Sequence, residues 1–344
     1  MKEEVINWLV SIPIHRADFK LFCLFGVSWV VFSLSVFGEP RKMHEYVGPD
    51  FSFDSKEVQT IHEKAESSIE QGNYVQALKL LEQALEITKK SSGANPRDVA
   101  NILLSIAEVY EEQGDSDKAL SVLRQSVETF QKSLAADHPV VARALIDIGQ
   151  ANRALGRFDD AVASFQKSLS IWKKAQGDQS IGVAWCLSNL GLAYRDQGKY
   201  AEALGLLTQA LPIVKQVLGE DDPQFAKLLN NLAVVYEDLA DYNQALTLGE
   251  RSVEIIEKAL GKEAPAVAYS LNNLASIYQE QGKYEQALSA LKRSLAIYER
   301  VFGMDHPRVA IGLNNLGKMH EDSRTPDIEP CENVRFFPQD ARIA

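Results

Sequence analysis

Residues 222–261 read DPQFAKLLNNLAVVYEDLADYNQALTLGERSVEIIEKALG, and units of this pattern recur every 42 residues along the chain. An alanine marks the same early step of each unit, at Ala100, Ala142, Ala184, Ala226, Ala268 and Ala310. A glycine marks a later step at Gly72, Gly114, Gly156, Gly198 and Gly282, where Ala240 stands in once. A fixed period of this size is typical of an array in which each unit buries its apolar face only against its neighbours. The sequence therefore predicts an extended repeat protein rather than one closed core.

Each unit is predicted to be a pair of antiparallel helices. Asp222 precedes Pro223, an acidic cap followed by proline at the first helical position, where a missing N–H costs nothing. Apolar residues recur at helical spacing over 228–236 and again over 242–260. The turn between these stretches carries glycine in most units, which suits a helix C-terminus that needs a left-handed residue. No strand pattern is present, so the expected fold class is all-α.

Small and aromatic residues repeat in the same register. The step of Ser252 holds only alanine or serine, which predicts close packing of helices there. Aromatic residues such as Tyr236 and Tyr242 recur at the end of the first helix and the start of the second. We interpret this aromatic stripe as core rather than as a cofactor site.

Four segments carry a resemblance to a known family. They are LSNLGLAY at 187–194, LNNLAVVY at 229–236, LNNLASIY at 271–278 and LNNLGKMH at 313–320, with Gly-Lys-Tyr turns at 198–200 and 282–284. The pattern resembles the tetratricopeptide repeat, in the 42-residue form of kinesin light chains and related proteins. The resemblance implies a right-handed α-solenoid of six helix-turn-helix hairpins plus a terminal capping helix, over residues 55–322.

Further segments flank the array. We expect a polar leader at residues 1–20, an apolar segment at 21–37, a linker at 38–54 and an irregular tail at 323–344. The apolar segment, LFCLFGVSWVVFSLSVF, has no charge over 17 residues, which is the short end of what crosses a bilayer. A membrane anchor, a cleaved targeting signal, and a buried segment or gene-model artefact are all open interpretations. Basic residues flank the segment on both sides, so the positive-inside rule assigns no orientation.

Composition and motifs argue against catalysis and against nucleic acid. The net charge of −11 is unlike the basic excess of a general nucleic-acid binder. The six histidines and three cysteines form no metal-ligand or catalytic spacing, and no phosphate-binding or dinucleotide loop is present. We therefore expect no enzyme activity, metal, cofactor, small-molecule substrate or nucleic-acid partner.

Asparagines form columns on the first helix of each unit, which is expected to line a concave groove. One column runs Ser105, Asp147, Asn189, Asn231, Asn273 and Asn315, and its neighbour includes Asn230, Asn272 and Asn314. A carboxamide matches the donors and acceptors of a peptide backbone, and the low helix propensity of asparagine indicates a reason beyond helix formation.

In the resembled family, asparagines at these positions clamp cargo peptides. The resemblance thus implies a peptide-binding groove at Asn189, Asn231, Asn273 and Asn315, with Asn230 and Asn272 as second candidates. In the alternative interpretation, the asparagines bond between neighbouring helices and fix the repeat spacing. Both roles can coexist.

These observations favour a non-catalytic adaptor or scaffold whose groove holds a partner peptide. Acidic residues at the ends of the first helices favour a partner of basic or mixed charge. Residues 21–37 would tether the protein to a membrane, with the array in the cytosol or an organelle. The alternatives are a soluble cytoplasmic adaptor of the kinesin light chain type, serving the cytoskeleton or a motor, and an assembly factor for an organellar membrane complex.

Overall fold

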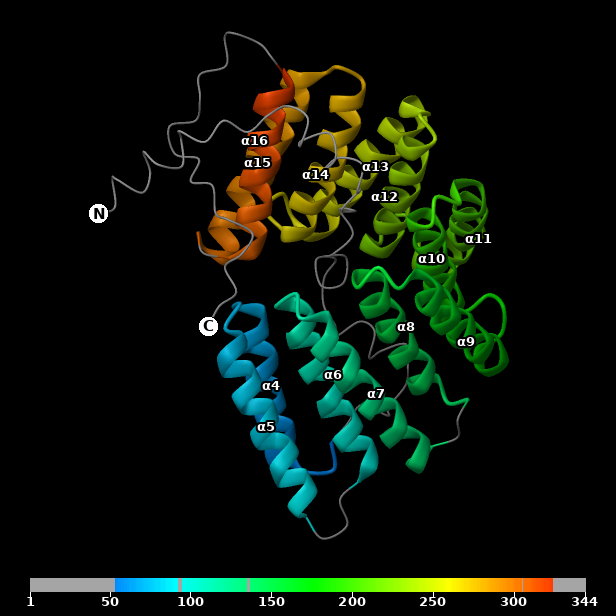
Figure 1. Cartoon of the computed structure of the whole chain (residues 1–344), viewed down its shortest axis with the longest axis vertical. Coiled ribbons are helices and arrows are strands. Elements are labelled where there is room, and N and C mark those ends of the chain that lie inside the picture. Colours follow the sequence, from blue (N-terminus) through cyan, green and yellow to red (C-terminus); the bar gives the residue numbers. More distant parts are fainter. Residues whose placement is uncertain (1–52, 92–94, 135–136, 305, 324–344) are drawn as a thin grey trace, which may run out of the picture. The chain divides into compact units, whose positions relative to one another are not determined.

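The computed structural model describes residues 53–91, 95–134, 137–304 and 306–323, which hold thirteen α-helices and no strand (Figure 1). The helices are α4 (Lys56–Glu70), α5 (Tyr74–Lys90), α6 (Pro96–Glu112), α7 (Ser116–Ser133), α8 (Pro139–Ala154), α9 (Phe158–Gln176), α10 (Ile181–Asp196), α11 (Tyr200–Leu218), α12 (Pro223–Asp238), α13 (Tyr242–Leu260), α14 (Pro265–Glu280), α15 (Tyr284–Phe302) and α16 (Pro307–Ser323). They confirm the all-α array of six hairpins and a final helix.

The predicted leader and apolar segment lie outside the described residues, as do the linker up to residue 52 and the tail from residue 324. Ser323, predicted to begin the tail, is the last residue of α16. Among the described helices, none combines the length and hydropathy that a bilayer crossing requires.

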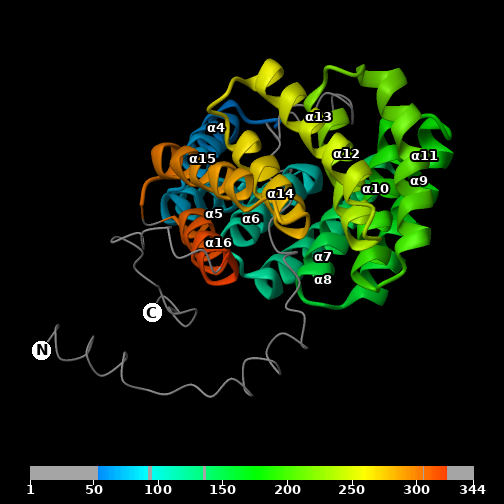
Figure 2. The same cartoon turned by 90° about the horizontal axis from the view of Figure 1, so that it is seen from above.

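Each hairpin pairs an even-numbered helix, here called helix A, with the odd-numbered helix B that follows it. Helix A packs on its own helix B, and that helix B packs on the next helix A (Figure 1). Successive A helices also approach one another, at α8–α10, α10–α12 and α12–α14 (Figure 2). The A helices therefore share one face of the array and form its inner lining.

A side chain caps the start of helix A in several repeats, as the sequence predicts at Asp222, whereas α10 and α14 begin without such a bond. The Asp222 carboxylate accepts a hydrogen bond from the Gln224 N–H at 2.7 Å, with Pro223 in the first turn. Asn95 caps α6 in the same way at 3.0 Å. His138 Nδ1 accepts the Val140 N–H at 3.3 Å at the start of α8. These bonds satisfy N–H groups that have no partner within the helix.

The turn between helix A and helix B requires a left-handed residue, as predicted. Gly198 has a φ of +75°, and a Cβ built on it would meet no atom within 4 Å. Ala240 holds the equivalent place with a φ of +59°, and among the described residues it is the one non-glycine with positive φ. A side chain costs free energy in this region because Cβ crowds the following carbonyl.

A repeated hydrogen bond joins the two helices of four hairpins at the small-residue step. Helix B serines donate their hydroxyls to helix A carbonyls at 2.6–2.8 Å, in the pairs Ser126–Ala100, Ser168–Ala142, Ser252–Ala226 and Ser294–Ala268. All four serine side chains are fully buried. The sequence predicted the close approach but not the bond, which explains why serine is tolerated in a dry interface.

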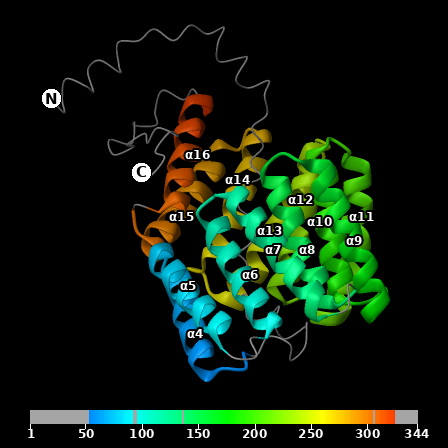
Figure 3. The same cartoon turned by 60° about the horizontal axis from the view of Figure 1, so that its bottom comes forward.

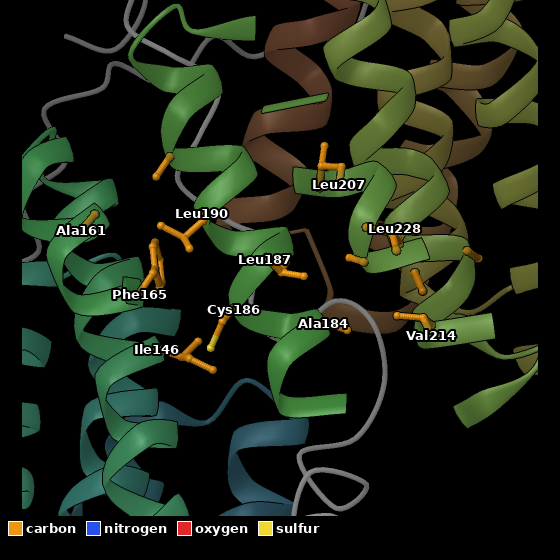
Figure 4. Packing of buried hydrophobic residues seen from close by; sticks show 14 of the residues in the cluster. Ile146, Ala161, Phe165, Ala184, Cys186, Leu187, Leu190, Leu207, Val214 and Leu228 are labelled. Atoms are coloured by element: carbon orange, nitrogen blue, oxygen red, sulfur yellow. The ribbon is translucent and has the colours of Figure 1, made fainter. Parts of the chain in front are cut away.

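The core within and between hairpins depends on glycines where large rings pack against a neighbouring helix. Phe165 of α9 packs against α8 and α10, close to Leu190 and Cys186 (Figure 4). A Cβ on Gly149 of α8 would lie 2.4 Å from the Phe165 ring, and one on Gly182 would lie 2.2 Å from Trp172. The repeated tyrosines are less buried than the core interpretation implied. Tyr194 and Tyr278 are only partly buried against the core, and Tyr284 is 36% exposed.

The Ala240 turn gives a test of this account. Ala240→Gly should raise the free energy of unfolding by about 0.5–1 kcal/mol. The change removes the steric penalty of a Cβ at positive φ, and this gain outweighs the larger conformational entropy of glycine in the unfolded chain. Gly198→Ala should lower it by a similar amount, since its site is open and only the backbone conformation penalises Cβ. Chemical denaturation of both variants and the wild type measures the effect. The same sign of change in both variants would contradict it.

Candidate functional site

A pocket lies on the inner face between α10 and α12. Its lining residues are Ala184, Trp185, Ser188, Asn189 and Leu192 of α10, Val214 of α11, and Gln224, Lys227, Leu228 and Asn231 of α12. The structure thus brings together two of the predicted asparagines, Asn189 and Asn231. An indole, an amine and two carboxamides on one concave surface can contact both the backbone and the side chains of an extended chain.

The two pocket asparagines also bond within the array. Asn231 Nδ2 donates to Ser188 Oγ at 3.1 Å, across to the preceding helix A. Gln150 Nε2 donates to Asn189 Oδ1 at 3.0 Å, and Asn189 Nδ2 donates to the Trp185 carbonyl at 2.9 Å. Each carboxamide has two N–H groups and two oxygen lone pairs, so these bonds leave it further capacity. The spacing role that the sequence left open is therefore compatible with a binding role.

The other predicted asparagines lie apart from this pocket. Asn272 and Asn273 are half-buried on α14, and Asn315 is buried on α16. Asn230 is 1% exposed and is not part of the pocket lining, so it faces the interior of the array. Of the six candidates, Asn189 and Asn231 line this pocket.

Trp185 and Lys227 are pocket residues that the sequence analysis missed. Each stands four residues before a predicted asparagine, and residues at i and i+4 share one helix face. Helical spacing could therefore have found them. Trp185 meets the ring of Trp172 edge-on at 6.5 Å between centroids, which fixes the indole against the array. Burial, and then the nearby Arg153, lower the pKa of Lys227 to about 8.

Two ion pairs join successive A helices near their C-terminal ends. Arg153 of α8 binds Asp196 of α10, and Arg195 of α10 binds Asp238 of α12, each 43 residues further along the chain. The side chains of Arg153 and Asp196 are only 5% and 1% exposed. Removing one member of so buried a pair leaves the other charge buried without a partner, which strongly destabilises the folded state. These residues are therefore structural.

The face of α6 and α8 is acidic. Glu108, Glu111 and Asp147 gather there, and Arg143 Nε donates to Asp147 at 3.3 Å. Burial raises the pKa of Glu108 to about 7, against the lowering effect of Arg143. The pKa of Glu111 is raised well above its ordinary value by burial and then by Asp147. Among the described residues, no group of three or more histidine, cysteine, aspartate or glutamate side chains could hold a metal ion.

The raised pKa of Glu108 predicts a pH-dependent stability difference. A carboxyl whose pKa rises from about 4.5 to about 7 on folding favours the folded state at low pH, and this contribution is lost between those values. The free energy of unfolding of Glu108→Gln minus that of the wild type should therefore increase by about 1–2 kcal/mol as the pH rises from 5 to 8. Denaturant unfolding across that range measures the difference. Exposed Glu202→Gln is the control, and a difference for Glu108→Gln as flat as the control would contradict the assignment.

Comparison with known proteins identifies the repeat. A model of the tetratricopeptide repeat matches residues 57–132, 98–171, 140–216, 224–300 and 267–327. No curated protein matches the chain. Among solved structures, BtubC (BKLC) from P. vanneervenii is similar with a TM-score of 0.53 and 22% identity, covering 65% of this chain and 90% of that one.

Two further solved structures are similar. A Rap protein complexed with competence and sporulation factor has a TM-score of 0.54 and 14% identity, covering 78% of this chain and 76% of that one. Repeats of a putative kinesin light chain from Podosopora anserina have a TM-score of 0.45 and 26% identity, covering 58% of this chain and 94% of that one. The family model spans most of the array, and the chain belongs to the tetratricopeptide-repeat family.

Proposed function

We propose that the protein is a non-catalytic adaptor that binds an extended segment of a partner protein along the inner face of the A helices. The family and its fold support a role in protein interaction in general. The observation that carries the finer proposal is the pocket between α10 and α12, where Trp185, Asn189, Lys227 and Asn231 share one concave surface. The Rap structure supports it by likeness of fold, because that protein is described in complex with a factor.

The pocket chemistry suits a peptide backbone flanked by side chains. The remaining donors and lone pairs of Asn189 and Asn231 can bond to backbone C=O and N–H groups of an extended segment. The indole of Trp185 offers apolar area beside them, and Leu192 and Leu228 add to it. Asn273 and Asn315 would continue the same column along the groove, with Asn272 as a second candidate beside them.

Charge along the inner face favours a segment of mixed sign. The α6–α8 face carries Glu108, Glu111 and Asp147, whose pKa values burial raises. A basic side chain of the partner would lower these pKa values again and favour the ionised carboxylates. Lys227, in the pocket itself, favours a carboxylate or a backbone carbonyl. A partner with an acidic or neutral stretch for the pocket and basic residues for the α6–α8 face would satisfy both.

The pocket asparagines provide the test. A random peptide library displayed on phage is selected against the full chain, and the enriched peptides are titrated by fluorescence polarisation. Asn189→Ala/Asn231→Ala should weaken binding by roughly tenfold or more, because two lost hydrogen bonds cost about 1 kcal/mol each. Asn243→Ala is the matched control, since Asn243 is exposed on the outer helix α13.

The double variant must keep the helicity and melting temperature of the wild type for this comparison. Equal affinity of the double variant and the Asn243→Ala control would contradict the assignment of the pocket. Peptides that compete with one another but bind both variants with the same affinity as the wild type would place the binding site on another face.

Residues 21–37 would tether this adaptor to a membrane, an interpretation that rests on their uncharged apolar sequence. The full chain, expressed with a C-terminal tag, should then stay in the membrane pellet after carbonate extraction at high pH. A variant lacking residues 21–37 should move to the supernatant. Release of the full chain by carbonate would instead favour the soluble adaptor of the kinesin light chain type. A shortened mature N-terminus would favour the imported assembly factor.

A further inference from the structure

The two ion pairs between successive A helices share one spacing along the chain. In each, an arginine near the end of one helix A binds a carboxylate 43 residues later, at the end of the next helix A. Glu112 ends α6 and occupies the carboxylate position of this spacing, in register with Asp196 and Asp238. The residue 43 positions before it is Ile69, where the other pairs have arginine. Glu112 is therefore buried at a position whose local cation is missing.

Arg308 supplies that cation from the far end of the array. Its Nη2 lies 3.2 Å from Glu112 Oε2, although the two residues are 196 positions apart. Both side chains are nearly buried, at 8% and 10% exposure. In earlier units the position of Arg308 holds Asp98, Val140, Gly182, Gln224 and Ala266, so the arginine is peculiar to the last helix.

A short hydrogen-bond chain accompanies the ion pair. The Nδ1 atom of His306 accepts the Arg308 N–H at 3.2 Å and caps α16. Its Nε2 then carries the proton and donates to Tyr74 Oη at 3.2 Å. The Tyr74 hydroxyl in turn donates to Glu112 Oε2 at 3.4 Å. Burial lowers the pKa of His306 to about 4, so the neutral ring that this chain requires is present at pH 7.

Aromatic stacking holds the two basic side chains in place. The His306 ring stacks on Phe302 at 4.4 Å between centroids, and the Arg308 guanidinium lies 4.9 Å from the centre of the same ring. On the other side, Gly72 approaches His306 closely enough that a Cβ there would lie 3.5 Å from its ring. The start of α16 thus contacts α5 through the His306–Tyr74 bond and α6 through the Arg308–Glu112 pair. Figure 3 shows α16 beside the first hairpin.

We propose that Arg308 and Glu112, with Tyr74 and His306, form a clasp that closes the array on itself by joining its last helix to its first two hairpins. Glu112 has no arginine 43 residues before it, and Arg308 takes the place of that missing cation. The clasp therefore completes a buried ion pair and does not add a surface one. If the inner face binds a partner as proposed above, closure also fixes the separation of the groove walls. Opening the clasp is then the movement that would admit a larger segment.

Distance measurement on the free protein tests the clasp without any partner. Spin labels at Lys79→Cys on α5 and Lys292→Cys on α15 occupy exposed sites on outer helices of the first and last hairpins. Cys23 and Cys331 are replaced by serine, and Cys186 is buried. Double electron–electron resonance on the full chain should give one narrow distance distribution. Arg308→Ala should broaden it and move it to longer distances.

Two further variants make the result specific. Arg300→Ala is the matched control, because Arg300 pairs with Glu263 on the surface near the same end of the chain. It should leave the distribution unchanged, whereas the charge exchange Glu112→Arg/Arg308→Glu should restore closure. Far-UV circular dichroism checks that helicity is retained. Should Arg308→Ala lose helicity, Glu112→Gln replaces it under the same criteria.

A distribution as broad in the wild type as in Arg308→Ala would overturn the clasp, and so would an unchanged distribution in a folded Arg308→Ala. Neither outcome bears on the peptide titrations, which use the pocket between α10 and α12. Failure of the clasp and failure of the proposed function can therefore be told apart.

Discussion

Close contact between helix A and helix B at the alanine-serine step sets the geometry on which the array depends. The contact is close because both residues are small, and in four hairpins the serine hydroxyl reaches the carbonyl of the helix A alanine. Helix B then presents its other side to the next helix A, and the same distance is repeated along the chain. The A helices consequently share one face, and residues at one step of the repeat fall in columns along it.

Because residues at equivalent steps of neighbouring repeats lie side by side, they form hydrogen bonds and ion pairs between repeats. Asn231, in the middle of α12, donates to Ser188, which stands 43 residues earlier. Arg195, near the end of α10, donates to Asp238, which stands 43 residues later. Another set reaches 39 residues, as Gln150 does to Asn189. The pocket between α10 and α12 arises where such contacts leave donors, an indole and an amine facing the groove. If this pocket binds a partner as proposed, structural and binding roles fall on the same residues, because one face of the array serves both.

The sequence predicts most of the fold because its determinants are local and repeated. Caps such as Asp222, left-handed turns such as Gly198 and small residues such as Ser252 act within one hairpin, so their periodicity is enough to place them. The lining of the pocket was predicted only in part. Composition and resemblance singled out Asn189 and Asn231, whereas Trp185 and Lys227 were missed because residues at their step of the repeat differ in type in every unit.

Asn230 was predicted to face the groove but is buried inside the array. It resembles its neighbour Asn231 in sequence, yet a rotation of about 100° per residue around the helix carries it from the groove into the interior. A one-residue difference in register decides whether a polar group meets a partner or is buried. Composition alone does not contain that information, and the relative position of neighbouring helices is needed to supply it.

Buried ion pairs favour a single alignment of neighbouring A helices. The side chains of Arg153 and Asp196 would each be stranded by a slip of one helix past the next, and a lone buried charge is far more costly than the pair is favourable. The pairs thus act chiefly against misalignment, in the way that single polar residues specify register in coiled coils. Glu112 obeys the same constraint with a partner from the other end of the chain. Because its local cation is absent, the buried carboxylate itself favours the arrangement in which α16 meets α6, and the rule that aligns neighbouring repeats extends to the closure of the whole array.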